Sequence, residues 1–291
     1  MSIRKKVRGM NHLSKERNYI VTGSNAHRIM GGVESQLKEY FFSEFDQWQT
    51  AYMLINDGIT DIRTLKKHIK DITAEKRDRV LKLIKSEKPF EMTKGMFSYA
   101  VEIAMAYFVT EKESGYQSRA MQNGVLNEID AVMAAEKYLG VEFDLTVDEQ
   151  EFFKKDNIGL TPDGILFNEL LLPSEGLEVK SPTQEIHFFN IKNVKTQKDL
   201  LNYYPEYYWQ CMTGIAVTGT NKWHWASYNE SFFDGYQLAY VEVFPVKDHV
   251  NLLLERAEMV VKKSLEIVEE IKTNKTNNFK NTTQINQLKA A

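Results

Sequence analysis

Cysteine is almost absent from this chain of 291 residues, which contains only Cys211. Disulfide frameworks, four-cysteine zinc sites and cysteine-ligated iron–sulfur clusters all need more thiols than this chain by itself supplies, so these classes are excluded. The six histidines are scattered and form no recognisable pair of metal ligands. Such low cysteine usage fits a reducing compartment, and we expect the protein to be cytoplasmic.

Long apolar runs are also missing. The first six residues, Met1 to Lys6, are basic, but no apolar segment of signal-peptide length follows them. No uninterrupted apolar run elsewhere is long enough to span a bilayer. We therefore predict a protein that is neither secreted nor embedded in a membrane.

A strong excess of charge of either sign is likewise absent. Lysine and arginine number 37 and aspartate and glutamate 40, which gives a formal net charge of -3. This balance argues against a protein that holds nucleic acid by bulk charge alone, yet it allows a catalytic centre whose carboxylates stay locally negative until metal binds. With 43% hydrophobic and 26% charged residues, the composition is that of a globular protein able to bury a sizeable core.

The order of apolar and turn residues predicts a helical first half and a mixed second half. Helical spacing extends over about 34–88, 96–109 and 121–139, and again from Pro205 and over 248–271. Strands are expected at 165–167, 177–181, 222–228 and 240–244, with an antiparallel hairpin across 160–181. Residues 273–291, rich in Asn, Thr and Lys, are typical of a disordered tail. We therefore expect a single domain over residues 1–272, followed by this tail.

One motif in the second half indicates chemistry. Pro162-Asp163 is followed fifteen positions later by Glu178-Val179-Lys180. Alternate residues of a strand share a face, so Glu178 and Lys180 project together, and a hairpin partner can bring Asp163 beside them. Two carboxylates, the Val179 backbone carbonyl and water suit Mg²⁺, which prefers hard oxygen ligands. Lys180 would then hold or help deprotonate an attacking water, while the metal stabilises charge on a phosphate.

Glu128, inside the predicted helix at 121–139, is a candidate ligand of a second metal ion, which would make a two-metal phosphodiesterase. Taken singly, each piece has a simpler interpretation. Pro-Asp-Gly is a turn sequence, Glu-x-Lys is common on solvated strand faces, and Glu128 alone is a surface acid on a helix. The order of the pieces, with apolar strand residues around both motifs, favours the catalytic interpretation.

Together these segments resemble the lambda exonuclease family, including the related YqaJ-type viral recombination nucleases, over most of 17–30 and 93–272. Residues 124–131, GVLNEIDA, match the family's G-x-x-x-E-x-x-A helix, and residues 161–164, TPDG, match its S-P-D-G. Residues 176–182, GLEVKSP, resemble its G-L-E-[LV]-K-x-P strand. The resemblance implies an α/β fold of restriction-endonuclease-like type, with a mixed central sheet flanked by helices.

Two further matches lie outside the metal site. Residues 17–24, RNYIVTGS, resemble a family segment whose Arg and Ser hold a terminal 5′-phosphate, which points to Arg17 and Ser24. A guanidinium, a hydroxyl and free N–H groups at a helix start make an anion site, although an N-cap beside a surface Arg has the same pattern. The helix containing Tyr207 and Gln210 resembles the family's Y-x-x-Q helix, in which the Gln reaches toward the catalytic water or metal and the Tyr flanks it near the DNA. Met212 replaces a second Gln that the family often carries.

The basic residues elsewhere are less specific. Arg119 stands where relatives carry a residue that contacts DNA phosphate, although a lone Arg is more often solvated. The largest departure is the stretch 34–88, which is typical of a helical insertion relative to the shorter relatives. Its basic residues Lys66, Lys67, Arg77 and Arg79 either touch DNA or a partner, or form a solvated helix face.

By resemblance, the chain is a Mg²⁺-dependent 5′-to-3′ exonuclease that uses two ions, with Mn²⁺ able to substitute. It would bind double-stranded DNA ends, digest the 5′-ended strand and leave a 3′ overhang for a single-strand annealing protein, in a bacterial cell or a phage-infected host. Lambda-type relatives assemble as ring-shaped trimers, so a homotrimer is expected. Two alternatives stay open: an endonuclease or single-strand nuclease with the same core, and a non-catalytic DNA-binding protein that keeps the fold.

Overall fold

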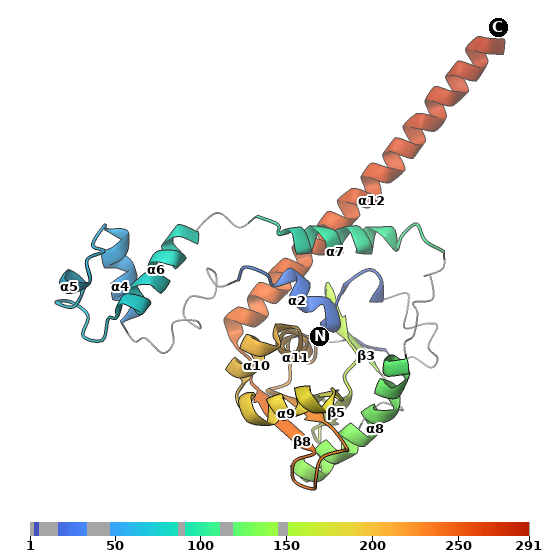
Figure 1. Cartoon of the computed structure of the whole chain (residues 1–291). Coiled ribbons are helices and arrows are strands. Elements are labelled where there is room, and N and C mark those ends of the chain that lie inside the picture. The colour runs from blue at the N-terminus through green and yellow to red at the C-terminus, as the bar shows by residue number, and fades with distance from the viewer. Residues whose placement is uncertain are drawn as a thin grey trace. The chain divides into compact units, whose positions relative to one another are not determined.

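The computed structural model describes residues 3–5, 17–33, 47–86, 91–110, 119–144 and 151–290. The chain divides into two compact units: unit 1 contains Met1–Met30 and Lys94–Ala291, and unit 2 contains Gly31–Thr93 (Figure 1). No helix of the described residues combines the length and the apolar composition that crossing a bilayer requires.

The strands of unit 1 form two four-stranded sheets. The first has the order β1 (Ile3–Lys5), β3 (Phe152–Lys155), β4 (Ile158–Leu160) and β2 (Val21–Thr22), and its β2–β4 pair is parallel. The second has the order β5 (Gly164–Phe167), β6 (Pro173–Lys180), β7 (Lys222–Tyr228) and β8 (Leu238–Val243). In this sheet β6 and β7 are parallel, whereas the two outer pairs are antiparallel. Both sheets are therefore mixed.

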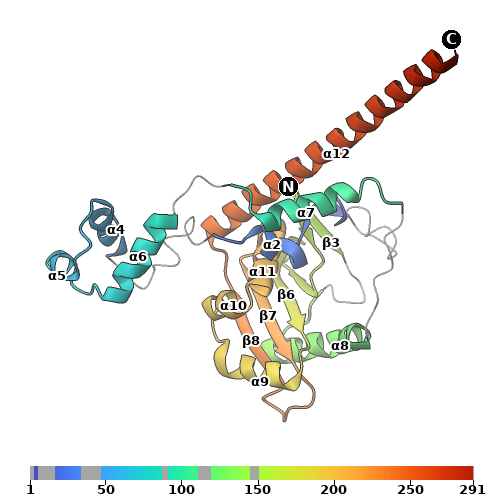
Figure 2. The same cartoon turned by 45° about the horizontal axis from the view of Figure 1, so that its top comes forward.

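Helices flank the two sheets. They are η1 (Gly23–Asn25), α2 (Ala26–Ile29), α7 (Lys94–Met105), α8 (Arg119–Leu139), α9 (Gln184–Asn193), α10 (Gln197–Tyr203), α11 (Pro205–Thr218) and α12 (Lys247–Ala290). In both views α7 lies alongside α12, and Figure 2 shows β6, β7 and β8 side by side. The α/β class predicted from the sequence is confirmed, with the strands divided between two sheets.

Two parts of unit 1 differ from the sequence-based expectation. The predicted hairpin across 160–181 is the β5–β6 pair alone, because Leu160 belongs to β4 in the other sheet. Residues 273–290 continue α12 as helix, where the composition predicts a disordered tail. This segment contains no Pro or Gly, so no residue in it forces the helix to stop.

A close approach between α11 and the second sheet fixes the position of that helix. The Trp223 side chain on β7 is fully buried, and it lies between Gly176 on β6 and Gly214 on α11. A Cβ atom added at either glycine would come within 2.4 Å of the Trp223 ring. Pro205 at the first turn and Gly219, whose φ is +74°, set the two ends of α11.

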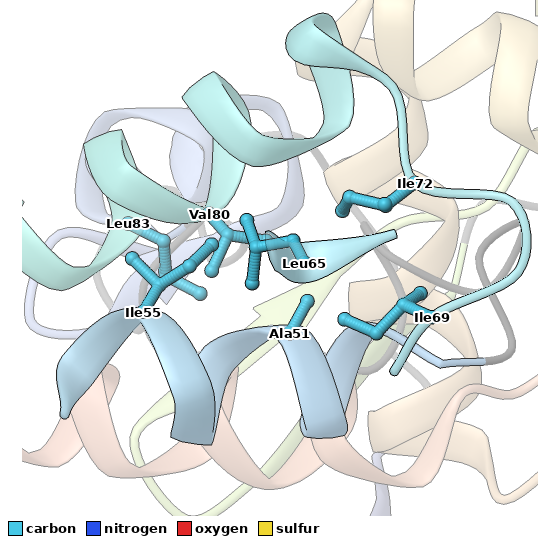
Figure 3. Packing of buried hydrophobic residues seen from close by; sticks show 7 residues of the cluster. All are labelled: Ala51, Ile55, Leu65, Ile69, Ile72, Val80 and Leu83. Carbon is cyan, nitrogen blue, oxygen red and sulfur yellow. The ribbon is translucent and has the colours of Figure 1, made fainter. Parts of the chain in front are cut away.

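Unit 2 has its own apolar core, built by α4 (Trp48–Asn56), α5 (Ile62–Leu65) and α6 (Ala74–Ser86). Figure 3 shows the buried side chains that meet in it: Ala51, Ile55, Leu65, Ile69, Ile72, Val80 and Leu83. Asp61 caps α5 by accepting from the Thr64 N–H at 2.8 Å, and the Thr73 hydroxyl accepts from the Lys76 N–H at 3.1 Å at the start of α6. Residues 34–46 and 87–88 of the predicted insertion lie outside the described residues. The assignment of 34–88 as an insertion in a single domain stays a prediction.

Candidate active site

Strand β6 sends alternate side chains to the two faces of the second sheet. Leu177 and Val179 pack in one apolar cluster with residues of α8. Glu178 and Lys180 therefore lie on the opposite face, toward α11. There the Lys180 ammonium forms an ion pair with Oε1 of Glu178.

Asp163 is held beside this pair by two backbone hydrogen bonds. Its N–H donates to the carbonyl of Leu177 at 3.1 Å, and its Oδ2 accepts from the Val179 N–H at 2.8 Å. Both bonds join the turn before β5 to β6, so the antiparallel pairing places the Asp163 carboxylate next to Glu178, as the motif spacing predicts.

The two carboxyl groups are deeply buried: Asp163 is 8% exposed and Glu178 1%. Burial raises the pKa of each, and repulsion from a neighbouring acid adds to it: from Glu128 at Asp163, and from Asp163 at Glu178. Burial would by itself lower the pKa of Lys180, but the Glu178 and Asp163 carboxylates outweigh it and raise that pKa. The centre thus gathers more acid than Lys180 can neutralise, which favours a bound cation.

Glu128 on α8 lies beside the same centre, because its carboxylate is among the charges that raise the pKa of Asp163. Among the described residues, no three acidic, histidine or cysteine side chains are already arranged as a metal shell. Two potential ligand oxygens have other partners, since Lys180 holds Oε1 of Glu178 and Val179 donates to Oδ2 of Asp163. Oε2 of Glu178, in contrast, is buried without a hydrogen-bond partner among the described residues. An unpartnered anionic oxygen among hard oxygen donors fits Mg²⁺, so the residues suit the expected metal.

An aromatic stack borders Lys180. Its ammonium lies 5.3 Å from the centroid of the Tyr207 ring, within the range of a cation–π contact. Tyr207 stacks on Tyr204 with centroids 5.5 Å apart, and both rings stack on Trp225 of β7 at 6.1 and 6.2 Å. Trp225 is paired with Glu178 in the sheet register, so the stack is anchored next to the acidic centre.

A cleft of about 1060 Å³ gathers three more of the predicted site residues of unit 1. Arg17, Ser24 and Gln210 all line it, together with Tyr99 of α7 and Thr161. Its walls therefore come from segments separated by more than a hundred residues in the sequence. The cleft adjoins the acidic centre along the chain, since Thr161 stands two positions before Asp163.

Arg17 is the cation of this cleft. One of its guanidinium nitrogens, Nη2, donates to the Thr161 hydroxyl, and the guanidinium carbon lies 5.2 Å from the centroid of the Phe152 ring. Burial lowers the pKa of Arg17, and in the part of the chain that the structure describes its buried Nε has no hydrogen-bond partner. Glu102, an acid of the same cleft, is engaged by Arg28 through two hydrogen bonds of 2.7 and 2.5 Å. Arg17 thus keeps its charge available to an anion.

Ser24 lies inside the 3₁₀ turn η1 rather than at the N-cap of a longer helix, and its side chain is exposed. Its hydroxyl is 3.5 Å from that of Thr22, which also receives a 3.0 Å hydrogen bond from the Asn25 amide. The Gln210 side chain lies against η1, because a Cβ atom at Gly23 would be 3.5 Å from Cγ of Gln210. In the described part of the chain, Gln210 makes no hydrogen bond to Asp163, Glu178 or Lys180.

The predicted residues thus form two neighbouring groups. The structure brings Glu128, Asp163, Glu178, Val179, Lys180 and Tyr207 together in the acidic centre, and Arg17, Ser24 and Gln210 together in the cleft. Arg119 begins α8, but its side chain lies outside what the structure describes. Sequence reasoning missed Thr161 and Tyr99. Thr161 stands within the Thr-Pro-Asp-Gly motif, which was a usable signal, whereas nothing in the sequence around Tyr99 relates that residue to the cleft.

The fold resembles that of LHK-Exo, an alkaline exonuclease from Laribacter hongkongensis. The crystal structure of LHK-Exo in complex with dAMP matches with a TM-score of 0.59 and 16% sequence identity, and the match covers 92% of this chain and 99% of that chain. A second LHK-Exo crystal structure matches with a TM-score of 0.54 and 19% identity, covering 65% of this chain and 89% of that chain. At such identities the likeness shows a shared fold.

Sequence comparison with curated proteins gave no match. A family model does match: the YqaJ-like viral recombinase domain aligns with residues 66–221, more than half of the chain. This range begins in unit 2 and includes Glu128, Asp163, Glu178, Lys180 and Gln210. The chain therefore belongs to the YqaJ-like viral recombinase domain family.

Proposed function

We propose that this chain is a magnesium-dependent exonuclease that digests the 5′-ended strand of double-stranded DNA from its ends. The observation that carries the proposal is the acidic centre, in which Asp163 and Glu178 are buried side by side against Lys180. Buried acids whose pKa values are raised are costly to keep charged unless a cation or a proton compensates them. Such arrangements are concentrated at functional sites.

Each residue has a distinct task in this proposal. Asp163, Glu178 and the Val179 carbonyl would hold one metal ion, and Glu128 would contribute to a second. When bound, Mg²⁺ supplies electrostatic stabilisation of the phosphate and of the leaving oxygen, and Mn²⁺ can replace it. Lys180, kept as an ammonium by the neighbouring carboxylates, would orient the attacking water and stabilise the hydroxide formed from it, while Gln210, on the wall of the cleft, would position the same water.

The cleft would select the DNA end. Arg17 supplies a half-buried guanidinium, and the Ser24 hydroxyl lines the same wall, so a terminal 5′-phosphate there would gain charge-assisted hydrogen bonds. Such contacts fix the position of the strand relative to the acidic centre without taking part in hydrolysis. Digestion from that end leaves a 3′ overhang, the substrate of a single-strand annealing protein. A ring-shaped homotrimer that encloses the duplex would keep a chain of net charge -3 on its substrate.

The test is a comparison of three substrates in Mg²⁺: linear duplex with 5′-phosphates, the same duplex with 5′-hydroxyls, and closed circular duplex. We expect fastest release of nucleotides from the phosphorylated ends and no nicking of circles. Asp163→Asn and Glu178→Gln should lower the rate by about 10²-fold or more, as loss of a single transition-state contact does in other enzymes. Arg17→Ala should shrink the phosphate preference mainly by slowing the phosphorylated substrate.

The comparison between substrates is internal, so a partly misfolded variant cannot imitate a change in preference. Equal rates on both kinds of end, together with nicking of circles, would replace the exonuclease with an endonuclease of the same core. Folded Asp163→Asn and Glu178→Gln proteins that cut at the parental rate would remove the acidic centre from the reaction. DNA binding without any cleavage by the wild type would favour the non-catalytic alternative.

A further inference from the structure

Unit 2 carries a group of exposed cations on α5 and in the turns that follow it. Arg63, Lys66, Lys67 and Lys70 are all exposed, and we call these four residues the basic face. Their spacing of three, four and seven positions is that of one face of a helix.

The backbone is helical through Leu65, where α5 ends, and it forms turns over 66–68 and 70–71. The N–H of Lys66 donates to the carbonyl of Ile62 at 3.0 Å, and the N–H of Ile69 donates to that of Leu65 at 2.9 Å. Leu65 and Ile69 are fully buried in the core of unit 2, where Figure 3 shows them among the packed side chains. The four exposed side chains of the basic face therefore point away from that core.

Little in the described residues neutralises these charges. Residues 47–86 contain nine lysines and arginines against five aspartates and glutamates, a net charge of +4 in a chain whose total is -3. None of the four residues of the basic face has an ion pair there, whereas Arg77 pairs with Asp78. Two acids flank the basic face in sequence: Asp71, directly after Lys70, and Asp61, two positions before Arg63. Asp61 is engaged as the cap of α5, where its Oδ2 accepts from both the N–H and the hydroxyl of Thr64.

We propose that unit 2 is a DNA-tethering module whose basic face binds the phosphate backbone of the duplex. A group of exposed cations without ion pairs among the described residues matches the closely spaced charges of a phosphate backbone. A membrane-binding helix would place bulky apolar residues beside the cations, but the intervening positions here are Thr64 and His68, with Leu65 buried. The basic face offers contacts to phosphate and none suited to base edges, so binding is independent of DNA sequence.

Unit 2 is connected to unit 1 at two points of the chain, so DNA that binds unit 2 is also linked to unit 1. Unit 2 leaves unit 1 after Met30 and returns at Lys94. In unit 1 these two points continue directly from α2 and into α7, and Tyr99 and Glu102 of α7 line the cleft. DNA held by unit 2 is therefore tethered to the unit that holds the cleft, which raises its effective concentration there. The inference rests on the proposed function, because it takes DNA as the substrate of unit 1.

The experiment measures binding apart from cleavage. The full chain carrying Asp163→Asn is titrated in EDTA with a blunt duplex of random sequence at several salt concentrations between 50 and 200 mM. Lys66→Gln/Lys67→Gln is compared with Lys262→Gln/Lys263→Gln, an adjacent lysine pair on α12 that gives the same change of net charge. We expect the first pair to weaken binding about ten-fold at the lowest salt and to reduce the slope of log K against log salt by about 2, one unit for each lost phosphate contact. The control pair should change neither.

The other outcomes contradict either this inference or the proposed function, and the two cases can be distinguished. Equal affinity and equal slope for the two lysine pairs would show that the basic face does not touch DNA, while cleavage by the unmutated chain would leave the proposed function standing. The same variants are also mixed with vesicles that contain phosphatidylserine. If Lys66→Gln/Lys67→Gln loses binding to these vesicles while its DNA binding is unchanged, the basic face binds a membrane and not DNA. No cleavage by the unmutated chain in Mg²⁺ would instead count against the proposed function, whatever the binding data show. Circular dichroism and thermal melts of each variant exclude loss of folding.

Discussion

The Lys180 ammonium makes two contacts, one with Glu178 and one with Tyr207. Binding of a metal ion would weaken the first contact and leave the second intact. Its ion pair with Glu178 shares a carboxylate with the expected metal, whereas its contact with the Tyr207 ring does not depend on that carboxylate. A ring face 5.3 Å from an ammonium contributes about 0.5–2 kcal/mol, depending on how well the pair is shielded from water. Tyr207 is thus a positioning residue for Lys180 in the metal-bound state.

We predict that Tyr207→Leu lowers kcat about ten-fold with little change in KM, because the Lys180 ammonium is positioned less accurately while DNA binding is unaffected. Tyr207→Phe keeps the ring face and should retain most of the activity. Tyr203→Leu, which removes a half-exposed tyrosine outside the stack, serves as the control. The check is steady-state kinetics on a phosphorylated duplex. If the Phe variant is as slow as the Leu variant, the hydroxyl group matters and the cation–π explanation is wrong.

At this scale the sequence predicts the acidic centre well because its geometry is local. Glu178 and Lys180 share a strand face by alternation, and Asp163 needs only one hairpin to reach them. The contact between Arg17 and Thr161 joins residues 144 positions apart, and no periodic pattern encodes such a separation. Ser24 was expected at a helix start, but the helix after it is a short turn whose length depends on packing, not on propensity.

Among the elements, α11 is placed by two glycines. The ring of Trp223 fills the space that a side chain at Gly176 or Gly214 would need, so the helix approaches the sheet more closely than it could with alanine at either position. This approach is what brings Tyr207 over Lys180 and Gln210 to the wall of the cleft.

Gly214→Ala should therefore destabilise unit 1 by about 1–3 kcal/mol, the usual cost of overpacking a buried site. Urea denaturation followed by tryptophan fluorescence measures the change. Gly31→Ala is the control, because no atom lies within 4 Å of a Cβ there, and it should change stability by less than about 0.5 kcal/mol. In the Trp223→Leu background the destabilisation by Gly214→Ala should largely vanish, since the indole ring that the added methyl group would contact is absent. Equal effects in both backgrounds would contradict this account of the packing.

Elements with strong sequence periodicity were predicted closely, and elements with weak periodicity were missed. The strand at 222–228 has the bounds of β7, and the helix expected from Pro205 is α11. Strands β2 and β4, of two and three residues, are too short to show a pattern and exist through pairing with each other. The cap of α5 lies at Asp61, whose carboxylate accepts from both the N–H and the hydroxyl of Thr64.

On the scale of the whole molecule, the division into two units has a thermodynamic consequence. Each unit has its own buried cluster, so each can lose its structure in a transition of its own. The acidic centre belongs to unit 1 alone, and a ligand stabilises only the state and the unit that bind it.

We predict two thermal transitions in EDTA, of which Mg²⁺ raises only the one that belongs to unit 1. At a concentration about a hundred times the dissociation constant, binding adds about 2.7 kcal/mol, which corresponds to roughly 5–10 °C for a unit of this size. Calorimetry measures both transitions, and fluorescence of Trp48→Phe assigns one of them, because the remaining tryptophans at 209, 223 and 225 all lie in unit 1. Glu178→Gln should abolish the shift by removing the buried oxygen that has no partner. A shift that survives in Glu178→Gln would mean that the metal binds elsewhere, and a common shift of both transitions would mean that the two units unfold together.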